Sequence, residues 1–357
     1  MRRDVEIGLL YSQSGDYAAI AAACRRGALN AVAAINADAE RCVRLIVIER
    51  DPGGNLDHYE PLCTEMLREG RVRHVVGCVT SSSRKEVIPA LEKAGGTLWY
   101  ACPYEGFECS DRVIYTHACA NQHLLPLLYW AFGRYGRRGH LVGSNYIWGW
   151  EMNRVAREVI ASAGGSVTGE RHQALGDADV GRLIDELRAA RPDFVLNNLI
   201  GQSSRAFLDA MRVLREEDPA FAEGSCPVLS CNLTECELPG FGAAAEGVIA
   251  AGPHFAGAPL WGAGHGAEAA SSFEAAAYVA VATLAALEER TGDPGTRLRS
   301  CGVDPETRHM ALPVLIARVE EGLFKVLEHS GAVEADPYLA RRERWPTARH
   351  PALRVVT

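Results

Sequence analysis

Short apolar segments alternate with longer helical segments through the first 245 residues of the chain, and this alternation constrains the fold most strongly. The apolar runs have the length of buried strands, and the segments between them have the spacing of helices. Strands that alternate with helices form βαβ units, which place the strands parallel in a sheet with helices on both faces. The pattern therefore predicts an α/β fold built on doubly wound parallel sheets.

The strand–helix pattern restarts near residues 119–121, after a first series of strands that begins at 5–12 and ends at 113–118. A second series follows, from a strand at 140–145 onward, and it is long enough to form a complete α/β lobe. At 357 residues the chain also exceeds the size at which a single core usually stops growing. We therefore expect two lobes, each with its own parallel sheet.

Composition argues against several classes of protein. The net charge of −8, with no basic run interleaved with aromatic residues, argues against direct binding of nucleic acid. The first apolar run, residues 5–10, is shorter than the core of a secretory signal, and no segment approaches the roughly 20 apolar residues of a membrane span. The eleven cysteines lie mostly in apolar segments, as buried thiols do in a reducing compartment. We therefore expect a cytoplasmic protein.

Residues 74–108 form the most informative stretch, with an apolar strand, a Ser-rich turn, a helix and a second strand. The turn 80–83 lies where a helix begins, and its unpaired N–H groups favour a carbonyl or carboxylate oxygen of a ligand. The second strand ends in Tyr100, Ala101, Cys102, Pro103 and Tyr104. Because ligands bind beyond the carboxyl ends of parallel strands, we interpret this edge as one wall of a small-molecule site. The alternative is that the serines only cap the helix and the aromatic residues only fill the core.

No catalytic or metal site is predicted. Ser81 has no Gly-x-Ser-x-Gly elbow and no traceable His or Asp partner, so nucleophilic catalysis is not expected. Glu105 and Glu108 are expected to order their loop rather than to act as an acid–base pair. The sequence contains no Cys-x-x-Cys pair and no Cys/His set with zinc spacing, and we expect no metal and no cofactor. The chain is therefore expected not to be an enzyme.

Several segments, in the same order along almost the whole chain, match one known family. They read IGLLYSQSG, RDPGGNLDHY, VGCVTSSSRKEVIPALEKA, WYACPYEGFE, GSNYIWGWEMN and AEGVIAAGPHF. On these motifs the chain resembles the type I periplasmic-binding-protein superfamily, specifically its amide- and urea-binding branch. Within that branch it resembles the amide-sensing negative regulators of aliphatic amidase operons, and PYEGFE together with RDPGG is the most specific part of the match.

The resemblance implies two α/β lobes that close on a ligand between them, with three crossings of the chain from lobe to lobe. The crossings fall near residues 119–121, 246–252 and the hairpin that follows Pro313. The first lobe is then expected to hold residues 1–119 plus 250–325, and the second lobe residues 120–249 plus 326–357.

The resemblance also implies which residues contact the ligand. In the family's pattern a small neutral amide is held by a Ser of the turn after the third strand, by a Tyr and a Thr at the end of the fourth strand, and by aromatic residues of the other lobe. Here Cys102 occupies the Thr position, while Trp148 and His254 each stand where the pattern has Tyr, which argues against acetamide itself. The ligand-binding residues carried over to this sequence are Ser81, Tyr100, Cys102, Pro103, Tyr146, Trp148, Ile200, Gly201, Asn232, Thr234 and His254.

Three functions stay open at this point. The first, implied by the resemblance, is a cytoplasmic sensor whose amide-dependent closure alters its hold on an antiterminator protein of an amidase or nitrile-degradation operon. The second is a substrate-binding protein that delivers urea, an amide or a branched-chain amino acid to the permease of an ABC transporter. The third, favoured least, is an enzyme. The expected partner is a small neutral ligand, with no direct nucleic acid and no membrane span, and a homodimer is left open.

Overall fold

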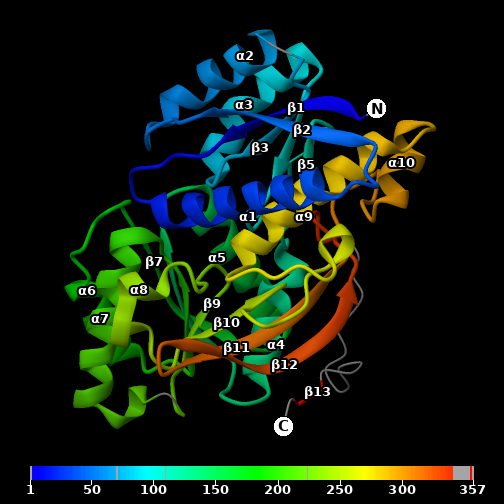
Figure 1. Ribbon diagram of the computed structural model, residues 1–357. Helices are drawn as coiled ribbons and strands as arrows, with labels where there is room; N and C mark the ends of the chain where they lie inside the picture. The colour runs from blue at the N-terminus through cyan, green and yellow to red at the C-terminus, as the bar shows by residue number, and fades with distance from the viewer. Residues whose placement is uncertain (1, 70, 109, 223, 341–353, 356–357) are drawn as a thin grey trace. The chain divides into compact units, whose positions relative to one another are not determined.

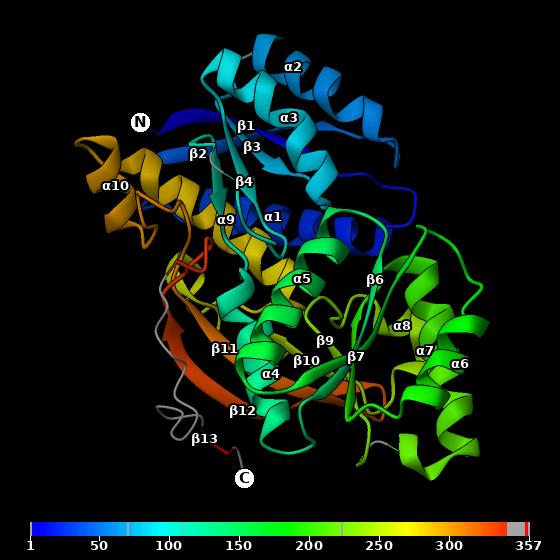
Figure 2. The same ribbon diagram turned by 180° about the vertical axis from the view of Figure 1, so that it is seen from behind.

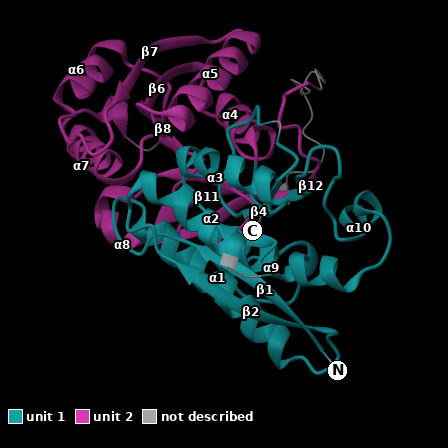
Figure 3. Ribbon diagram, turned by 90° about the horizontal axis from the view of Figure 1, so that it is seen from above, with its two compact units in different colours: residues 1–118, 256–312 teal, residues 119–255, 313–357 magenta. Residues whose placement is uncertain are grey.

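The computed structural model describes residues 2–69, 71–108, 110–222, 224–340 and 354–355 of the chain. The chain divides into two compact units, each with its own sheet (Figure 3). It passes from one unit to the other three times, after residues 118, 255 and 312. Unit 1 comprises residues 1–118 and 256–312, and unit 2 comprises residues 119–255 and 313–357.

Unit 1 is built on a five-stranded sheet in which every neighbouring pair of strands is parallel. Its strand order is β2-β1-β3-β4-β5, so the chain adds strands first on one side of β1 and then on the other (Figure 1). Most residues of the inner strands are buried, as expected for a parallel sheet covered by helices on both faces. The strands are β1 (Arg3–Leu10), β2 (Val43–Arg50), β3 (His74–Gly77), β4 (Thr97–Tyr100) and β5 (Val113–Tyr115).

Two pairs of helices cover the sheet of unit 1. Helices α1 and α9 lie on one face of the sheet, and α2 and α3 lie on the other (Figures 1 and 2). Most of α9 is buried, and its many alanines allow close packing against α1. The helices are α1 (Ala18–Ala37), α2 (Tyr59–Glu69), α3 (Ser81–Ala94), α9 (Ser272–Glu289) and α10 (Pro294–Ser300), with 3₁₀ turns at Leu56–His58 and Gly262–Gly264.

Unit 2 is built on an eight-stranded mixed sheet in the order β13-β12-β11-β10-β9-β8-β6-β7. The five strands from β6 to β10 run parallel, and β11 pairs antiparallel with β10. The hairpin of β11 and β12 thus extends the sheet beyond its parallel part. The strands are β6 (Arg138–Ser144), β7 (Ser166–Gln173), β8 (Phe194–Asn198), β9 (Val228–Ser230), β10 (Ile249–Gly252), β11 (Leu312–Glu320), β12 (Leu323–Val333) and β13 (Arg354–Val355).

Apolar cores lie on both faces of the unit 2 sheet. On β6, Leu141 belongs to the core that includes residues of α4 and α5, whereas Val142 belongs to the core that includes residues of α6 and α7. Adjacent residues of a strand point to opposite faces, so the two helix pairs cover opposite faces. The helices are α4 (Leu124–Phe132), α5 (Ile147–Ser162), α6 (Gly181–Ala190), α7 (Gly201–Glu217) and α8 (Leu238–Phe241), with 3₁₀ turns at Ala120–Gln122, Pro219–Phe221 and Gly242–Ala245.

The observed unit boundaries differ from the expected lobe boundaries. We assigned residues 1–119 and 250–325 to the first lobe, but residues 119, 250–255 and 313–325 belong to unit 2. The reason is strand pairing, because β10 pairs parallel with β9 and antiparallel with β11, which commits all three to the second sheet. The part of our second range that follows residue 340 lies outside the described residues, apart from β13.

The hairpin that the sequence predicts around residues 321–322 is confirmed. Strands β11 and β12 are neighbours in the sheet and are joined by Glu321 and Gly322. Both residues have positive φ angles, of 55° and 74°, as the tight turn of a two-residue hairpin requires.

Helix α1 departs from our expectation that no segment approaches a membrane span. It is the one helix within the described ranges that is long and apolar enough to cross a membrane, with 20 residues. Its buried face packs against α9, and a Cβ atom on Gly27 would lie 2.1 Å from the carbonyl oxygen of Glu274. Because the core helices of globular proteins have the same length and composition, this feature is weak evidence for a span.

We expect Gly27→Ala to destabilise unit 1 by at least about 2 kcal/mol, because the new methyl group would collide with the backbone of α9. Urea unfolding curves of the wild type and the variant measure the difference. Gly240→Ala in α8 is the control, since a Cβ atom there meets nothing within 4 Å. Equal stability of the Gly27 variant and the wild type would mean that α1 and α9 do not pack this closely.

Candidate functional site

The two sheets share one topological feature. In unit 1 the order β2-β1-β3-β4-β5 reverses direction between β1 and β3, and in unit 2 the parallel strands reverse in the same way between β6 and β8. Two strands that leave such a point toward opposite sides create a crevice beyond their carboxyl ends, where open α/β sheets bind ligands. Each unit therefore has one edge that is suited to a ligand.

Four predicted residues gather at this edge of unit 1. Ser81 is the first residue of α3, shortly after β3. Tyr100 ends β4, and Cys102 and Pro103 follow it. All four are buried, with Ser81 only 2% exposed. The structure thus brings these four residues together within unit 1, as expected from the adjacent parallel strands β3 and β4.

The start of α3 is capped in a way that leaves donors for a ligand. Thr80 accepts a hydrogen bond from the N–H of Ser83, and the Ser83 hydroxyl in turn accepts one from the N–H of Thr80. This reciprocal cap satisfies two backbone donors of the first turn. The N–H groups of Ser81 and Ser82 have no acceptor within a helix and lie at the positive end of the helix dipole, so they favour an acceptor atom.

Tyr100 and Cys102 hold the loop that leads into α3. The Tyr100 hydroxyl donates to the carbonyl oxygen of Val79 over 2.7 Å, and the Cys102 thiol approaches the carbonyl oxygen of Cys78 at 3.7 Å. Cys78 has a φ angle of 64°, a left-handed conformation that is uncommon for residues other than glycine. Burial raises the pKa of the Cys78 thiol, so this group stays protonated and is not a thiolate nucleophile.

A buried ion pair lies beside Ser81 that our sequence interpretation did not include. Arg84 and Glu105 are 0% and 1% exposed and form two contacts, of 2.5 Å and 3.3 Å. The same Glu105 carboxylate accepts a hydrogen bond of 2.9 Å from the Ser81 hydroxyl. The expectation that Glu105 and Glu108 order their loop is confirmed, since Glu108 pairs with Lys85 at 3.2 Å on the outer side of α3.

Aromatic rings surround the guanidinium of Arg84. It lies 5.0 Å from the ring centroid of Tyr100 and 4.9 Å from that of Tyr104. Tyr115 stacks on His309 with ring centroids 4.3 Å apart. Burial disfavours the charge of Arg84, but the facing Glu105 carboxylate outweighs it and raises the pKa of the guanidinium. The guanidinium therefore stays charged in a dry, aromatic surrounding.

The predicted residues of unit 2 follow four strands that are neighbours in its sheet. Tyr146 precedes α5 in the loop after β6, and Trp148 lies in the first turn of α5. Ile200 precedes α7 in the loop after β8, and Gly201 is the first residue of α7. Asn232 and Thr234 follow β9, and His254 follows β10. Because β6, β8, β9 and β10 are parallel, all of these residues leave the same edge of the sheet.

Hydrogen bonds tie these loops of unit 2 to one another. The Ser144 hydroxyl accepts from the N–H of Ile200 at 3.2 Å, and the Asn232 side-chain amide donates to the carbonyl of Leu199 at 3.3 Å. Helices α5 and α7 begin at this edge without a side-chain cap. Their first N–H groups are therefore a second set of donors for a ligand.

Trp148, Ile200, Thr234 and His254 are the buried members of the predicted set in unit 2. Trp148 is 4% exposed and packs in the apolar core with Met152, and its ring centroid lies 5.9 Å from that of His123. His254 is fully buried. Tyr146 and Asn232, by contrast, are half-buried.

Glu237 is a further group at this edge that the sequence interpretation missed. Its N–H donates to the carbonyl oxygen of Thr234 at 3.1 Å, which places it in the loop after β9. Burial raises the pKa of the Glu237 carboxyl to about 8. The residue as a whole is half-buried, but one carboxyl oxygen is enclosed and has no hydrogen-bond partner among the described residues. No motif in the sequence distinguishes it from a surface Glu.

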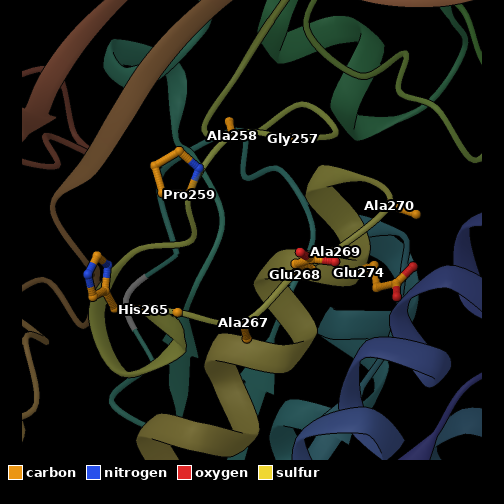
Figure 4. A pocket seen from close by; sticks show the side chains of 10 residues that line it. Gly257, Ala258, Pro259, His265, Ala267, Glu268, Ala269, Ala270 and Glu274 are labelled. Atoms are coloured by element: carbon orange, nitrogen blue, oxygen red, sulfur yellow. The ribbon is translucent and has the colours of Figure 1, made fainter.

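A hollow of about 640 Å³ lies elsewhere in unit 1, along the segment 257–270 (Figure 4). His265 and Pro259 stand on one side of it, and Glu274 stands on the other side and points toward α1. The Glu274 carboxylate is already paired with Arg26 at 2.6 Å. The other polar side chains of the lining, His265 and Glu268, are exposed, and we favour the sheet edges.

No set of three His, Cys, Asp or Glu side chains is arranged to hold a metal ion in the part of the chain that the structure describes.

The sequence and the fold agree with one known family. A family model described as "Periplasmic binding protein domain" matches residues 5–260. The chain belongs to this family. The interpretation of the protein as a ligand-binding protein of this kind is thereby confirmed, while the amide-sensing branch stays a prediction.

Solved structures agree on the fold. One is a solute-binding protein of an ABC transporter from Rhodopseudomonas palustris HaA2 in complex with p-hydroxybenzoic acid, with a TM-score of 0.78 and 19% identity over 95% of this chain and 100% of that one. Another is a branched-chain amino acid transporter substrate-binding protein from Streptococcus pneumoniae in complex with isoleucine, with a TM-score of 0.75 and 15% identity over 93% of this chain and 99% of that one. The predicted type I fold is confirmed.

The buried His309 makes the stability of unit 1 depend on pH. Burial lowers the pKa of His309 to about 4, so between this value and about 6.5 the unfolded chain binds a proton that the folded chain does not. The free energy of unfolding therefore falls as the pH falls, by about 2 kcal/mol between pH 7.5 and pH 5. Urea unfolding at both pH values measures this change.

His309→Phe keeps a ring against Tyr115 but does not titrate, and we expect it to remove this share of the pH dependence. His329→Gln is the control, because His329 is exposed on β12. An unchanged pH dependence in the Phe variant would show that His309 is protonated equally in both states.

Proposed function

We propose that the protein is the substrate-binding protein of an ABC transporter and binds a small neutral ligand such as urea, a short amide or a related compound. The observation that carries the proposal is that the residues predicted from the family pattern lie at the sheet edge predicted from the strand order. The residues carried over from the family pattern follow strands at the edge where each sheet reverses its strand order. Residues that only fill the core would be spread over each sheet and would not all lie at this edge in both units.

The groups at the edge of unit 1 support an uncharged ligand. In unit 1 the edge offers the backbone donors of Ser81 and Ser82, a hydroxyl group and the apolar surface of Pro103. The charged groups that contact Ser81 and the start of α3, Arg84 and Glu105, neutralise each other. Mostly apolar sites with a few convergent polar groups are typical for small molecules, and an unmatched polar group there costs about 1–3 kcal/mol.

A second candidate is the cytoplasmic amide sensor that acts on an antiterminator protein. The specific observation in its favour is that ten cysteines within the described residues are thiols rather than disulfides, most of them buried. Disulfides are common in exported proteins, whereas buried thiols are usual in reducing compartments. Fractionation of native cells separates the two candidates: an exported protein supports transport, and a cytoplasmic one that co-purifies with an RNA-binding regulator supports the sensor.

A thermal-shift panel tests ligand binding itself. Short amides, urea and branched-chain amino acids are each added to the purified protein, and we expect at least one to raise the Tm because binding stabilises the folded state by mass action. Ser81→Ala is expected to weaken binding of that ligand about tenfold or more, as titration calorimetry would measure.

Ser300→Ala is the matched control, because this exposed hydroxyl at the end of α10 bonds within its own helix, to the carbonyl of Arg297. If Ser81→Ala and Ser300→Ala bind the ligand equally well, the site has been placed at the wrong edge.

A further inference from the structure

The hydroxyl of Ser81 has a fixed hydrogen-bond polarity. It contacts a Glu105 carboxylate oxygen at 2.9 Å. An ionised carboxylate only accepts hydrogen bonds, and a hydroxyl has a single proton. The Ser81 proton is therefore directed to Glu105, and what the hydroxyl offers to any other neighbour is an acceptor.

The Glu105 carboxylate is in turn held in place by Arg84. Both carboxylate oxygens contact the guanidinium, at 2.5 Å and 3.3 Å, and two contacts of this kind fix the plane of the carboxylate. The rings of Tyr100 and Tyr104 cover the guanidinium at about the same distance, 5.0 Å and 4.9 Å from their centroids. Both partners are enclosed, with Arg84 0% and Glu105 1% exposed.

We infer that Arg84 and Glu105 are positioning residues that set ligand selectivity through Ser81. They keep the Ser81 oxygen as an acceptor next to the backbone donors of the first turn of α3. A ligand group that carries a hydrogen-bond donor beside an acceptor matches this arrangement. A carboxylate does not match it, because its oxygen would face the lone pairs of Ser81. This inference rests on the proposed ligand site at Ser81.

A purely structural role for the ion pair is the competing explanation. Pairs of this kind often stabilise a fold no better than apolar residues of similar size, so stability alone is a weak reason for one. The two roles differ in what they predict for ligands. A structural role affects all ligands alike, whereas a positioning role changes the ratio of affinities between ligands that differ only in hydrogen-bond polarity.

The test compares two matched pairs of probes, benzamide with benzoate and isobutyramide with isobutyrate, by titration calorimetry. For at least one pair we expect the wild type to bind the amide at least about tenfold more tightly than the acid. The double variant Arg84→Met with Glu105→Gln removes the pair without leaving a buried charge and without changing the net charge. The amide that replaces the Glu105 carboxylate can turn either way, so the preference should shrink about tenfold, toward equal affinities.

A control variant, Arg26→Met with Glu274→Gln, removes another ion pair of unit 1, with a contact of 2.6 Å, that does not touch Ser81. It should keep the wild-type ratio even where it lowers the Tm. An unchanged ratio in the Arg84/Glu105 variant, or a wild type that prefers the acids, overturns the inference alone. A wild type that binds none of the four probes and nothing in the wider panel overturns the proposed function, and this inference with it.

Discussion

The parallel pairing of strands is the constraint on which the rest of this structure depends. In each unit it sends the carboxyl ends of the parallel strands to one edge, and the reversal of strand order opens that edge between β1 and β3 or between β6 and β8. Residues as distant in the chain as Tyr146 and His254 therefore leave the same side of one sheet. The loops between them are tied by bonds such as that from the N–H of Ile200 to Ser144.

The element types of this fold could be predicted because apolar periodicity is a local property. Strand β6, Arg138–Ser144, begins and ends within two residues of the strand expected at 140–145. Helix α10 could not be predicted, since seven residues without an apolar stripe depend on a cap from Asp293 and on neighbours that the sequence does not reveal. The unit boundaries near residues 250 and 313 depend on which sheet a strand joins, and that is decided by tertiary pairing.

Some residues of the candidate site could likewise be placed from the sequence, and others could not. Ser81 and Tyr100 could be placed because Ser81 lies in the turn after one apolar run and Tyr100 lies at the end of the next, and both positions are readable from sequence. Arg84 and Glu105 are 21 residues apart in the chain, and the sequence around neither residue indicates that the two form a pair. One signal was available: Arg84 lies three, four and seven residues before apolar Val87, Ile88 and Leu91, on the buried stripe of α3. A charged residue on such a stripe needs a buried partner.

The free-energy cost of burying the Arg84–Glu105 ion pair indicates what the pair contributes. Desolvating two charges costs several kcal/mol per ion, and a well-formed contact with cation–π support at Tyr100 and Tyr104 offsets that cost without a large surplus. What the charged pair provides that apolar side chains cannot is direction: a carboxylate held in one plane dictates where the Ser81 proton lies. In a dry site a hydrogen bond of the wrong polarity costs more than one exposed to water. At the ligand site that we propose at Ser81, such an ion pair therefore acts on selectivity more than on stability.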